Sequence, residues 1–208
     1  MTRDDLSEAL GFDVSRETYQ RLAGYHDLLV QWSKTHNLIG PKEREHIWDR
    51  HFLDSLQIWP LVSNEETLLD IGSGAGFPGL VIACMAMDQA GPKCILVEAN
   101  AKRCAFLRHV TNSLGLNVEV LNQRIEDVSR ETVDVVTARA VADLSKLVEM
   151  SAKWLENGAK AVFLKGQTHD DELTETRRYW NFKVDLTPSK SDSFGAVLCL
   201  SEVRTRDV

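Results

Sequence analysis

The alternation of apolar and polar residues divides the chain into two regions with different periodicities. In the first region apolar side chains recur at helical spacing, as Tyr19, Leu22 and Leu29 illustrate. An Asn-Leu-Ile-Gly-Pro stretch interrupts this pattern, and a further helix is predicted over residues 43–59. We therefore expect residues 1–60 to form a helical extension.

The second region alternates short apolar strands with helical segments. This alternation favours a mostly parallel sheet with helices on both faces, and two strands close together at the end predict an antiparallel edge. We expect residues 61–208 to form an α/β, Rossmann-like domain with a seven-stranded sheet, in one compact unit with the extension. Strands are predicted over 67–71, 94–97, 118–121, 133–137, 159–164, 182–186 and 196–200, and helices over 78–87, 101–114, 144–155 and 169–179.

The charge of the chain argues against a general nucleic-acid binder but leaves room for a local basic surface. The 208 residues carry a formal net charge of -7, whereas proteins that bind nucleic acid through their overall charge are basic. Residues 99–118, however, contain no Asp or Glu and include Lys102, Arg103 and Arg108. One face of an acidic protein could therefore still meet a phosphate backbone.

The four cysteines and the N-terminus indicate a reducing compartment. No Cys-x-x-Cys pair occurs, so we expect buried free thiols and no metal site. The first residues are charged and lack the apolar segment of a signal peptide. The longest apolar run, residues 80–87, is far too short to span a membrane. These features predict a cytoplasmic protein without a membrane partner.

A glycine-rich loop follows the first predicted strand, where ligands of open α/β sheets bind. Gly72, Gly74 and Gly76 remove side chains at alternate positions, so that the backbone can approach a ligand closely. Asp70, two residues earlier, would be unfavourable beside a pyrophosphate but favourable near the sulfonium and ammonium groups of S-adenosylmethionine. The alternative is a tight turn in which Asp70 binds backbone amides.

Glu98 ends the next predicted strand, 22 residues after Gly76. An acidic residue at about this interval accepts hydrogen bonds from ribose hydroxyls, although an exposed Glu at a strand end is also common. Residues 74–79 satisfy G-x-G-x-x-G when read loosely, which leaves a dinucleotide-dependent oxidoreductase as one alternative. A binding module that has lost its chemistry is the other.

Taken together, the motifs resemble the RsmG family, also called glucose-inhibited division protein B (GidB). The glycine loop alone is typical of class I methyltransferases in general, and the helical Arg-His-x-x-Asp-Ser element makes the resemblance more specific. The matching segments are Asn37-Leu38, 50–55, 70–79, Lys102-Arg103 before Phe106-Leu107, 124–126, 137–140 and 164–166.

The resemblance implies a class I methyltransferase fold and a 16S rRNA (guanine-N7)-methyltransferase that uses S-adenosylmethionine on the 530 loop. It implies cofactor contacts from Gly72, Phe77, Ile125, Glu126 and Arg139; the residues alone add Gly74, Glu98 and Asp70. The chain departs from the family near its C-terminus. Residues 192–195 read Asp-Ser-Phe-Gly where the family commonly has Arg-His.

Attack by the N7 lone pair of guanine requires no proton removal, so we expect a positioning mechanism and assign no catalytic residue. His51, Asp54 and Ser55 share one face of the predicted helix, where they either anchor the extension or border the substrate. The expected partner is 16S rRNA within the small ribosomal subunit, and we expect a monomer. Candidate RNA contacts are Arg50, His51, Lys102, Arg103 and Lys165.

Overall fold

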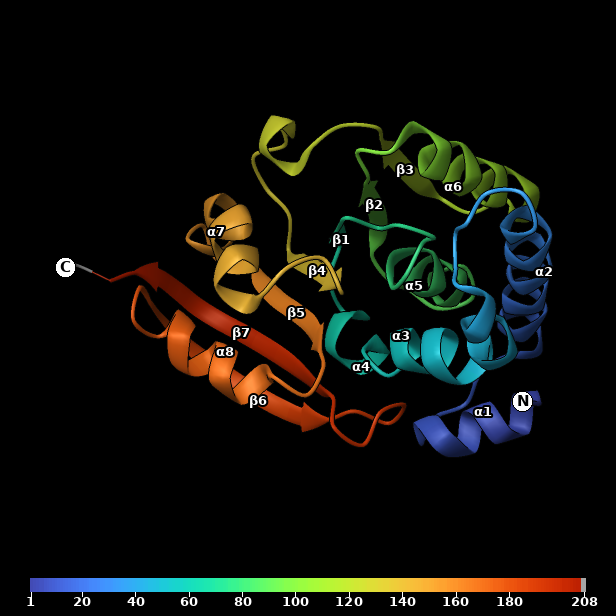
Figure 1. The fold of residues 1–208 in the computed structure, drawn as a ribbon, viewed down its shortest axis with the longest axis horizontal. Coiled ribbons are helices and arrows are strands. Elements are labelled where there is room, and N and C mark those ends of the chain that lie inside the picture. Colours follow the sequence, from blue (N-terminus) through green and yellow to red (C-terminus); the bar gives the residue numbers. More distant parts are fainter. Residues whose placement is uncertain (207–208) are drawn as a thin grey trace.

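The structure, a computed structural model, describes residues 1–206 apart from the side chains of Pro41 and Lys42. Seven strands form one sheet in the order β3-β2-β1-β4-β5-β7-β6 (Figure 1). The first five strands are parallel, and β7 runs antiparallel to both of its neighbours. The strands are β1 (Thr67–Ile71), β2 (Lys93–Val97), β3 (Val118–Leu121), β4 (Val135–Arg139), β5 (Lys160–Lys165), β6 (Trp180–Pro188) and β7 (Ala196–Thr205).

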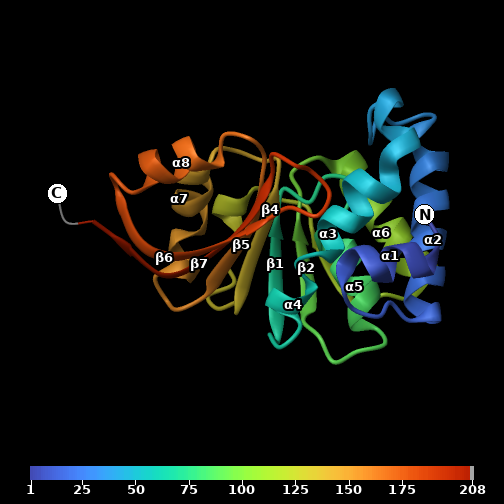
Figure 2. The ribbon, with the colours of Figure 1, turned by 90° about the horizontal axis from the view of Figure 1, so that it is seen from below.

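Helices cover both faces of the sheet (Figure 2). On one face, α5 (Gly79–Ala86) and α6 (Ala101–Leu114) bury apolar side chains in a core that they share with the N-terminal helices. On the other face, α7 (Leu144–Leu155) packs against the sheet in a second core, and α8 (His169–Thr176) packs beside it. The expected α/β fold with an antiparallel edge is confirmed.

The bounds of β2 and β5 differ from the prediction by one residue at one or both ends, and the larger differences in β4 and in the β6–β7 hairpin follow from hydrogen bonds. The fourth strand was expected over 133–137 but runs from Val135 to Arg139. Asp134 exchanges side chain–backbone hydrogen bonds with Thr67, and the pairing of β1 with β4 begins only at the next residue. The hairpin of β6 and β7 extends beyond the predicted segments, because mostly exposed residues of β6 complete the pairing without an apolar pattern.

The single helix expected over 43–59 is wrong. A 3-10 helix, η1 (Pro41–His46), leads into a π-helix, η2 (Trp48–Leu53), and two short helices, α3 (Asp54–Leu56) and α4 (Trp59–Val62), follow. Pro60 accounts for the last interruption, since its nitrogen has no hydrogen to donate to the preceding turn. The segment therefore consists of four short helical elements in place of one continuous helix.

The N-terminal helices α1 (Arg3–Leu10) and α2 (Arg16–Ser33) pack onto the sheet domain rather than apart from it. Leu22 and Leu29 are fully buried in the same core as Leu80 of α5. Burial of this kind removes apolar surface from water at about 25 cal/mol per Å². This packing supports one compact unit, the organisation that we propose for residues 1–60 and 61–208.

The cysteines are free thiols, and three of them are buried. Burial raises the pKa of Cys84 to about 12, because the thiolate would lose its hydration. Within residues 1–206, no group of His, Cys, Asp and Glu side chains is placed to hold a metal ion. No helix of this described part is long and apolar enough to cross a membrane.

Tyr25 of α2 links the extension to the glycine loop. Its hydroxyl donates a hydrogen bond to the carbonyl of Ala75, and its ring stacks on Phe77 with centroids 5.5 Å apart. Burial raises the pKa of Tyr25 well above its usual value, so the hydroxyl keeps its proton for this bond. The loop after β1 is therefore held partly by the extension.

Replacing Tyr25 with Phe should lower the free energy of unfolding by about 1–2 kcal/mol, because the Ala75 carbonyl would be left buried without its donor. Tyr19→Phe on the same helix is the matched control, since its hydroxyl bonds only to the exposed carbonyl of Met1. Urea unfolding of both variants checks the prediction. Equal losses in the two variants would contradict it.

Candidate functional site

Two adjoining cavities lie at the carboxyl ends of the parallel strands. The smaller, of about 310 Å³, is bordered by Gly72 after β1, Glu98 after β2 and Ile125 after β3. The larger, of about 570 Å³, is bordered by η2, the ends of β4 and β5, and the 189–195 loop between β6 and β7. Ala140 lines both, so the two cavities meet beside the end of β4.

The glycine loop forms one wall of the smaller cavity. The backbone of Gly72 has φ +61°, and a Cβ there would come within 2.9 Å of a methyl group of Val141. Gly74 has φ +57°, but a Cβ there would meet nothing nearer than a carbonyl oxygen at 3.7 Å. Packing against Val141 thus requires a glycine at position 72, whereas a side chain at position 74 would not clash with its neighbours.

Glu98 fixes this loop to the end of β2. One carboxylate oxygen accepts a hydrogen bond from the Gly74 amide at 2.9 Å, and the other accepts one from the Asn100 amide at 2.7 Å. A carboxylate offers about four lone-pair sites, so Glu98 can accept further bonds from the cavity. Arg103 lies 3.8 Å from the same carboxylate.

The far wall of the smaller cavity combines an apolar surface with a polar rim. It comes from the 3-10 turn η3 (Ile125–Asp127) after β3. Ile125 is buried against the second core, whereas Glu126 is exposed. The structure thus brings together four of the predicted cofactor residues, Gly72, Glu98, Ile125 and Glu126, around one cavity.

Asp70 does not line either cavity, in contrast to its expected place beside a cation. It is fully buried; one carboxylate oxygen accepts from the Thr137 hydroxyl at 2.9 Å and the other from the Gly79 amide at 3.3 Å. Burial raises its pKa to about 6 against the opposing effect of these bonds. Asp70 ties β1 to β4 and α5, which matches the alternative of a turn held by backbone amides.

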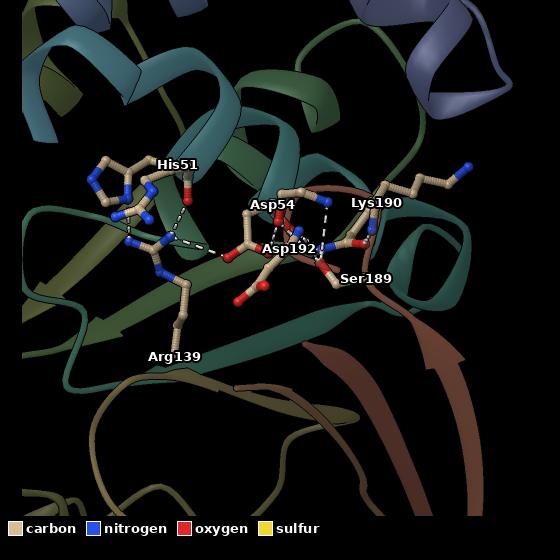
Figure 3. Close-up of polar contacts among 9 residues, drawn as sticks. His51, Asp54, Arg139, Ser189, Lys190 and Asp192 are labelled. Carbon is tan, nitrogen blue, oxygen red and sulfur yellow. Dashed lines mark hydrogen bonds and ion pairs between the residues drawn. The ribbon is translucent and has the colours of Figure 1, made fainter. Parts of the chain in front are cut away.

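Arg139, the last residue of β4, holds the wall of the larger cavity (Figure 3). Its guanidinium donates to the carbonyl of Arg50 at 2.8 Å and pairs with Asp54 at 3.2 Å. A third bond, of 2.7 Å, joins it to Nδ1 of His51. The Phe77 ring lies beneath, 5.0 Å from the guanidinium carbon, so Phe77 supports Arg139 from inside the core.

His51 is neutral in this arrangement. Arginine cannot accept a hydrogen bond, so Nδ1 of His51 must be the acceptor and the ring hydrogen sits on Nε2. Burial, together with the charge of Arg139, lowers the pKa of His51 to about 4. The ring stacks on Phe77 at 4.8 Å between centroids. A neutral, buried imidazole has no charge to offer a phosphate.

Asp54 connects the extension to the C-terminal hairpin, a contact that sequence reasoning missed. Its second oxygen accepts from the Ser191 hydroxyl at 2.6 Å, while the side-chain oxygen of Gln57 accepts from the Lys190 amide at 2.8 Å (Figure 3). Ser55, expected on the same helix face, is fully buried instead. No spacing along the chain could indicate partners 137 residues apart.

The remaining candidate cations lie in different environments. Lys165 is almost buried at the larger cavity, where it pairs with Glu172 at 2.6 Å and donates to the Ala142 carbonyl. Arg50 is exposed at the mouth of the same cavity. Lys102 is exposed on the first turn of α6 and lines neither cavity. Of the five RNA candidates, three border the larger cavity, Arg103 borders the smaller one and Lys102 borders neither.

Comparison with known sequences identifies a family. The sequence model described as rRNA small subunit methyltransferase G matches residues 18–193. A ribosomal RNA small subunit methyltransferase G from Paramagnetospirillum magneticum is 46% identical over 191 residues, 91% of each chain. The same-named protein of Brucella anthropi is 41% identical over 207 residues, which cover 99% of this chain and 97% of the relative.

Solved structures of methyltransferases have folds similar to that of this chain. A SAM-dependent methyltransferase from Aquifex aeolicus superposes with a TM-score of 0.57 at 17% identity, over 81% of this chain and 96% of the other. TYW2 of M. jannaschii, solved with AdoMet, gives 0.53 at 14% identity over 70% and 72% of the two chains. The expected methyltransferase fold is confirmed by this likeness.

Gly74→Val should abolish binding of S-adenosylmethionine in calorimetry, because the branched side chain would stand beside Gly72 and Glu98, which both border the smaller cavity. It should also cost about 1–2 kcal/mol of stability, the penalty for a left-handed backbone. Gly115→Val is the matched control: its φ is +64°, it ends α6, and a side chain there meets nothing. Only the Gly74 variant should lose the cofactor, and binding retained there would exclude this placement.

The stability of the wild type relative to Asp70→Asn should fall as the pH rises from about 4 to about 6. The folded-state pKa of Asp70 lies above the unfolded value of 3.8, so the folded state binds more protons in this window. A shift of about two units corresponds to roughly 3 kcal/mol. Urea unfolding across the pH range measures the difference, and parallel curves for the two proteins would refute the raised pKa.

Proposed function

The chain belongs to the rRNA small subunit methyltransferase G family, and we propose that it methylates N7 of a guanine in the 530 loop of 16S rRNA. Membership makes it an S-adenosylmethionine-dependent methyltransferase of small-subunit rRNA; the base, the atom and the loop are the finer part of the proposal. The main support for this proposal is the pair of cavities that meet at Ala140. One suits a nucleoside cofactor, and the other suits an acceptor base.

The smaller cavity has the groups that an adenosine moiety requires. We propose that Glu98 accepts hydrogen bonds from the ribose hydroxyls, that Ile125 packs on the adenine ring and that Glu126 reaches its edge. Gly72 and Gly74 let the backbone approach the ligand. S-adenosylmethionine, when bound, supplies an activated methyl group, and these residues orient it toward the junction of the cavities.

Arg139 is proposed to meet the charged end of the cofactor at that junction. It lines the larger cavity next to Ala140, and its three described bonds leave guanidinium hydrogens free, since arginine has five donors. A guanidinium binds a carboxylate in two-point fashion, and the methionine part of the cofactor ends in one. We propose no direct contact for Asp70, whose oxygens are engaged inside the fold.

The larger cavity supports chemistry by positioning. The N7 atom of guanine attacks with a lone pair, so the protein has no proton to remove, and His51 already uses its free nitrogen to accept from Arg139. Holding two reactants in line can lower the barrier by about 7–11 kcal/mol. We propose that the bonds of Arg139 to η2 keep the cavity wall rigid for this purpose.

Exposed cations at the rims of the two cavities and on the first turn of α6 are proposed to contact RNA phosphates. Arg50, Lys102 and Arg103 have the exposure that this role requires, whereas Lys165 is paired and is proposed to hold the Ala142 segment instead. With a net charge of -7, the enzyme gains little from bulk attraction to RNA. We propose that the substrate is the assembled small subunit in the cytoplasm and that the enzyme acts as a monomer.

Methyl transfer from labelled S-adenosylmethionine to small subunits that lack the native modification tests the proposal. One methyl group per subunit should be incorporated and map to N7 of a guanine in the 530 loop. The single-turnover rate constant should be flat between about pH 6.5 and 8.5, because no general base has to be deprotonated. Label on another base, or on an exocyclic amine, would contradict the proposal.

A further inference from the structure

We infer that the carboxylate of Asp192 recognises the Watson–Crick edge of the target guanine and thereby turns N7 toward the junction of the cavities. The inference rests on the proposed function, because it names the group that selects the acceptor base. Asp192 lies in the 189–195 loop that borders the larger cavity. Nothing in its sequence neighbourhood marks it as a binding residue.

Four carboxylates border the larger cavity, and two of them form ion pairs with cations of the cavity wall. Asp54 pairs with Arg139, and Glu172 pairs with Lys165. Both pairs lie at least four-fifths buried and hold the walls together. Their charges are thus neutralised within the protein.

Each of the other two carboxylates, Glu43 and Asp192, accepts a hydrogen bond from a backbone amide. Glu43 accepts from the Gly40 amide at 2.9 Å and so caps the first turn of η1. One oxygen of Asp192 accepts from the amide of Phe194 at 3.0 Å, which orients the side chain. Asp192 makes no ion pair with any residue that the structure describes.

The side chain of Asp192 points away from the hydrogen-bonded cluster around Asp54 and Ser189. In Figure 3 its carboxylate lies between the stem of Arg139 and Ser189. A carboxylate in this position is held by its neighbour's amide at one oxygen and can accept bonds from a ligand at the other. Within the described part of the chain, the cavity therefore presents two carboxylates that its own cations do not pair with, Glu43 and Asp192, and Asp192 is the more exposed of the two.

Guanine matches such a group along one edge. Its Watson–Crick edge carries the N1 and N2 hydrogens next to O6, whereas the edge with N7 and O6 offers only acceptors. An ionised carboxylate only accepts hydrogen bonds, so it attracts the first edge and repels the second. Guanine bound to Asp192 in this way exposes N7 on the opposite side, where the methyl group must arrive.

The same contact also acts on the reaction. The lone pair of N7 forms the new N–C bond, the electron pair of the broken C–S bond remains on sulfur, and the guanine ring acquires a positive charge. A carboxylate beside the ring stabilises that charge as it develops. Asp192 should therefore influence the rate of methyl transfer as well as the affinity for the base.

An exposed aromatic ring on the same loop also favours the binding of a base in the cavity. Phe194 is 65% exposed, and its neighbours Ser193 and Gly195 both border the cavity. Bases taken out of an RNA strand commonly stack on aromatic side chains. A ring at the rim beside a carboxylate in the cavity suits an unpaired base better than it suits a phosphate.

The test combines Asp192→Asn with inosine in place of the target guanosine. Inosine keeps N1–H, O6 and N7 but lacks the N2 amine. Small subunits reconstituted with either nucleoside are compared for equilibrium binding without the cofactor and for single-turnover methyl transfer. The wild type should favour guanosine by about tenfold or more, as expected for a hydrogen bond to a charged group, and Asp192→Asn should lose this preference.

Controls separate recognition from folding. Asp192→Asn keeps an oxygen for the Phe194 amide and should bind S-adenosylmethionine as the wild type does; Asp192→Ser repeats the test with a different shape. Asp185→Asn removes the same charge from an exposed site on β6, away from the cavity, and should retain the full preference. Glu43→Gln tests the alternative carboxylate.

Each of the other outcomes would contradict the inference, and each would point to a different cause. Wild-type enzyme that treats guanosine and inosine alike, or Asp192→Asn with an undiminished preference, removes Asp192 from base recognition while N7 methylation stands. Loss of the preference in Glu43→Gln alone assigns recognition to that residue instead. Wild-type enzyme that transfers no methyl group to guanine N7 would defeat the proposed function itself.

Discussion

The larger cavity depends on the ion pair between Arg139 and Asp54. Arg139 ends β4, Asp54 belongs to the helical extension, and Asp54 in turn holds Ser191 of the C-terminal hairpin loop. Their side chains are only 18% and 16% exposed. Removing one partner would leave the other charge poorly solvated, which is far more damaging than losing an exposed pair. Three segments distant in sequence are thus joined at one point.

The end of β4 also divides the two cavities. Ala140, directly after Arg139, has φ 54°, a left-handed conformation that costs a residue with a Cβ about 1–2 kcal/mol. This turn places Val141 against Gly72, so that the larger and the smaller cavity share one wall. Strain of this kind persists where surrounding contacts hold it, and the bonds of Arg139 provide them.

Local motifs allowed the strands, the glycine loop and the gathering of Gly72, Glu98 and Ile125 around one cavity to be predicted from sequence. Gly72, Glu98 and Ile125 each follow a strand, and parallel strands bring their carboxyl ends together. The partners of Asp54 could not be predicted, because they lie 85 and 137 residues away. The burial of Asp70 away from both cavities could not be predicted either, because it depends on tertiary packing with β4 and α5.

The distribution of charge indicates that affinity for RNA and selectivity for one base come from different parts of the protein surface. Phosphate contacts position a protein on a nucleic acid, and contacts to base edges determine which base is read. Arg50 and Lys102 are exposed, whereas the cations that border the larger cavity from β4 and β5 are paired with Asp54 and Glu172. A phosphate drawn into the cavity would therefore find few free cations there. An uncharged base with hydrogen-bond donors can enter without displacing these ionic partners, which agrees with the acceptor site that we propose.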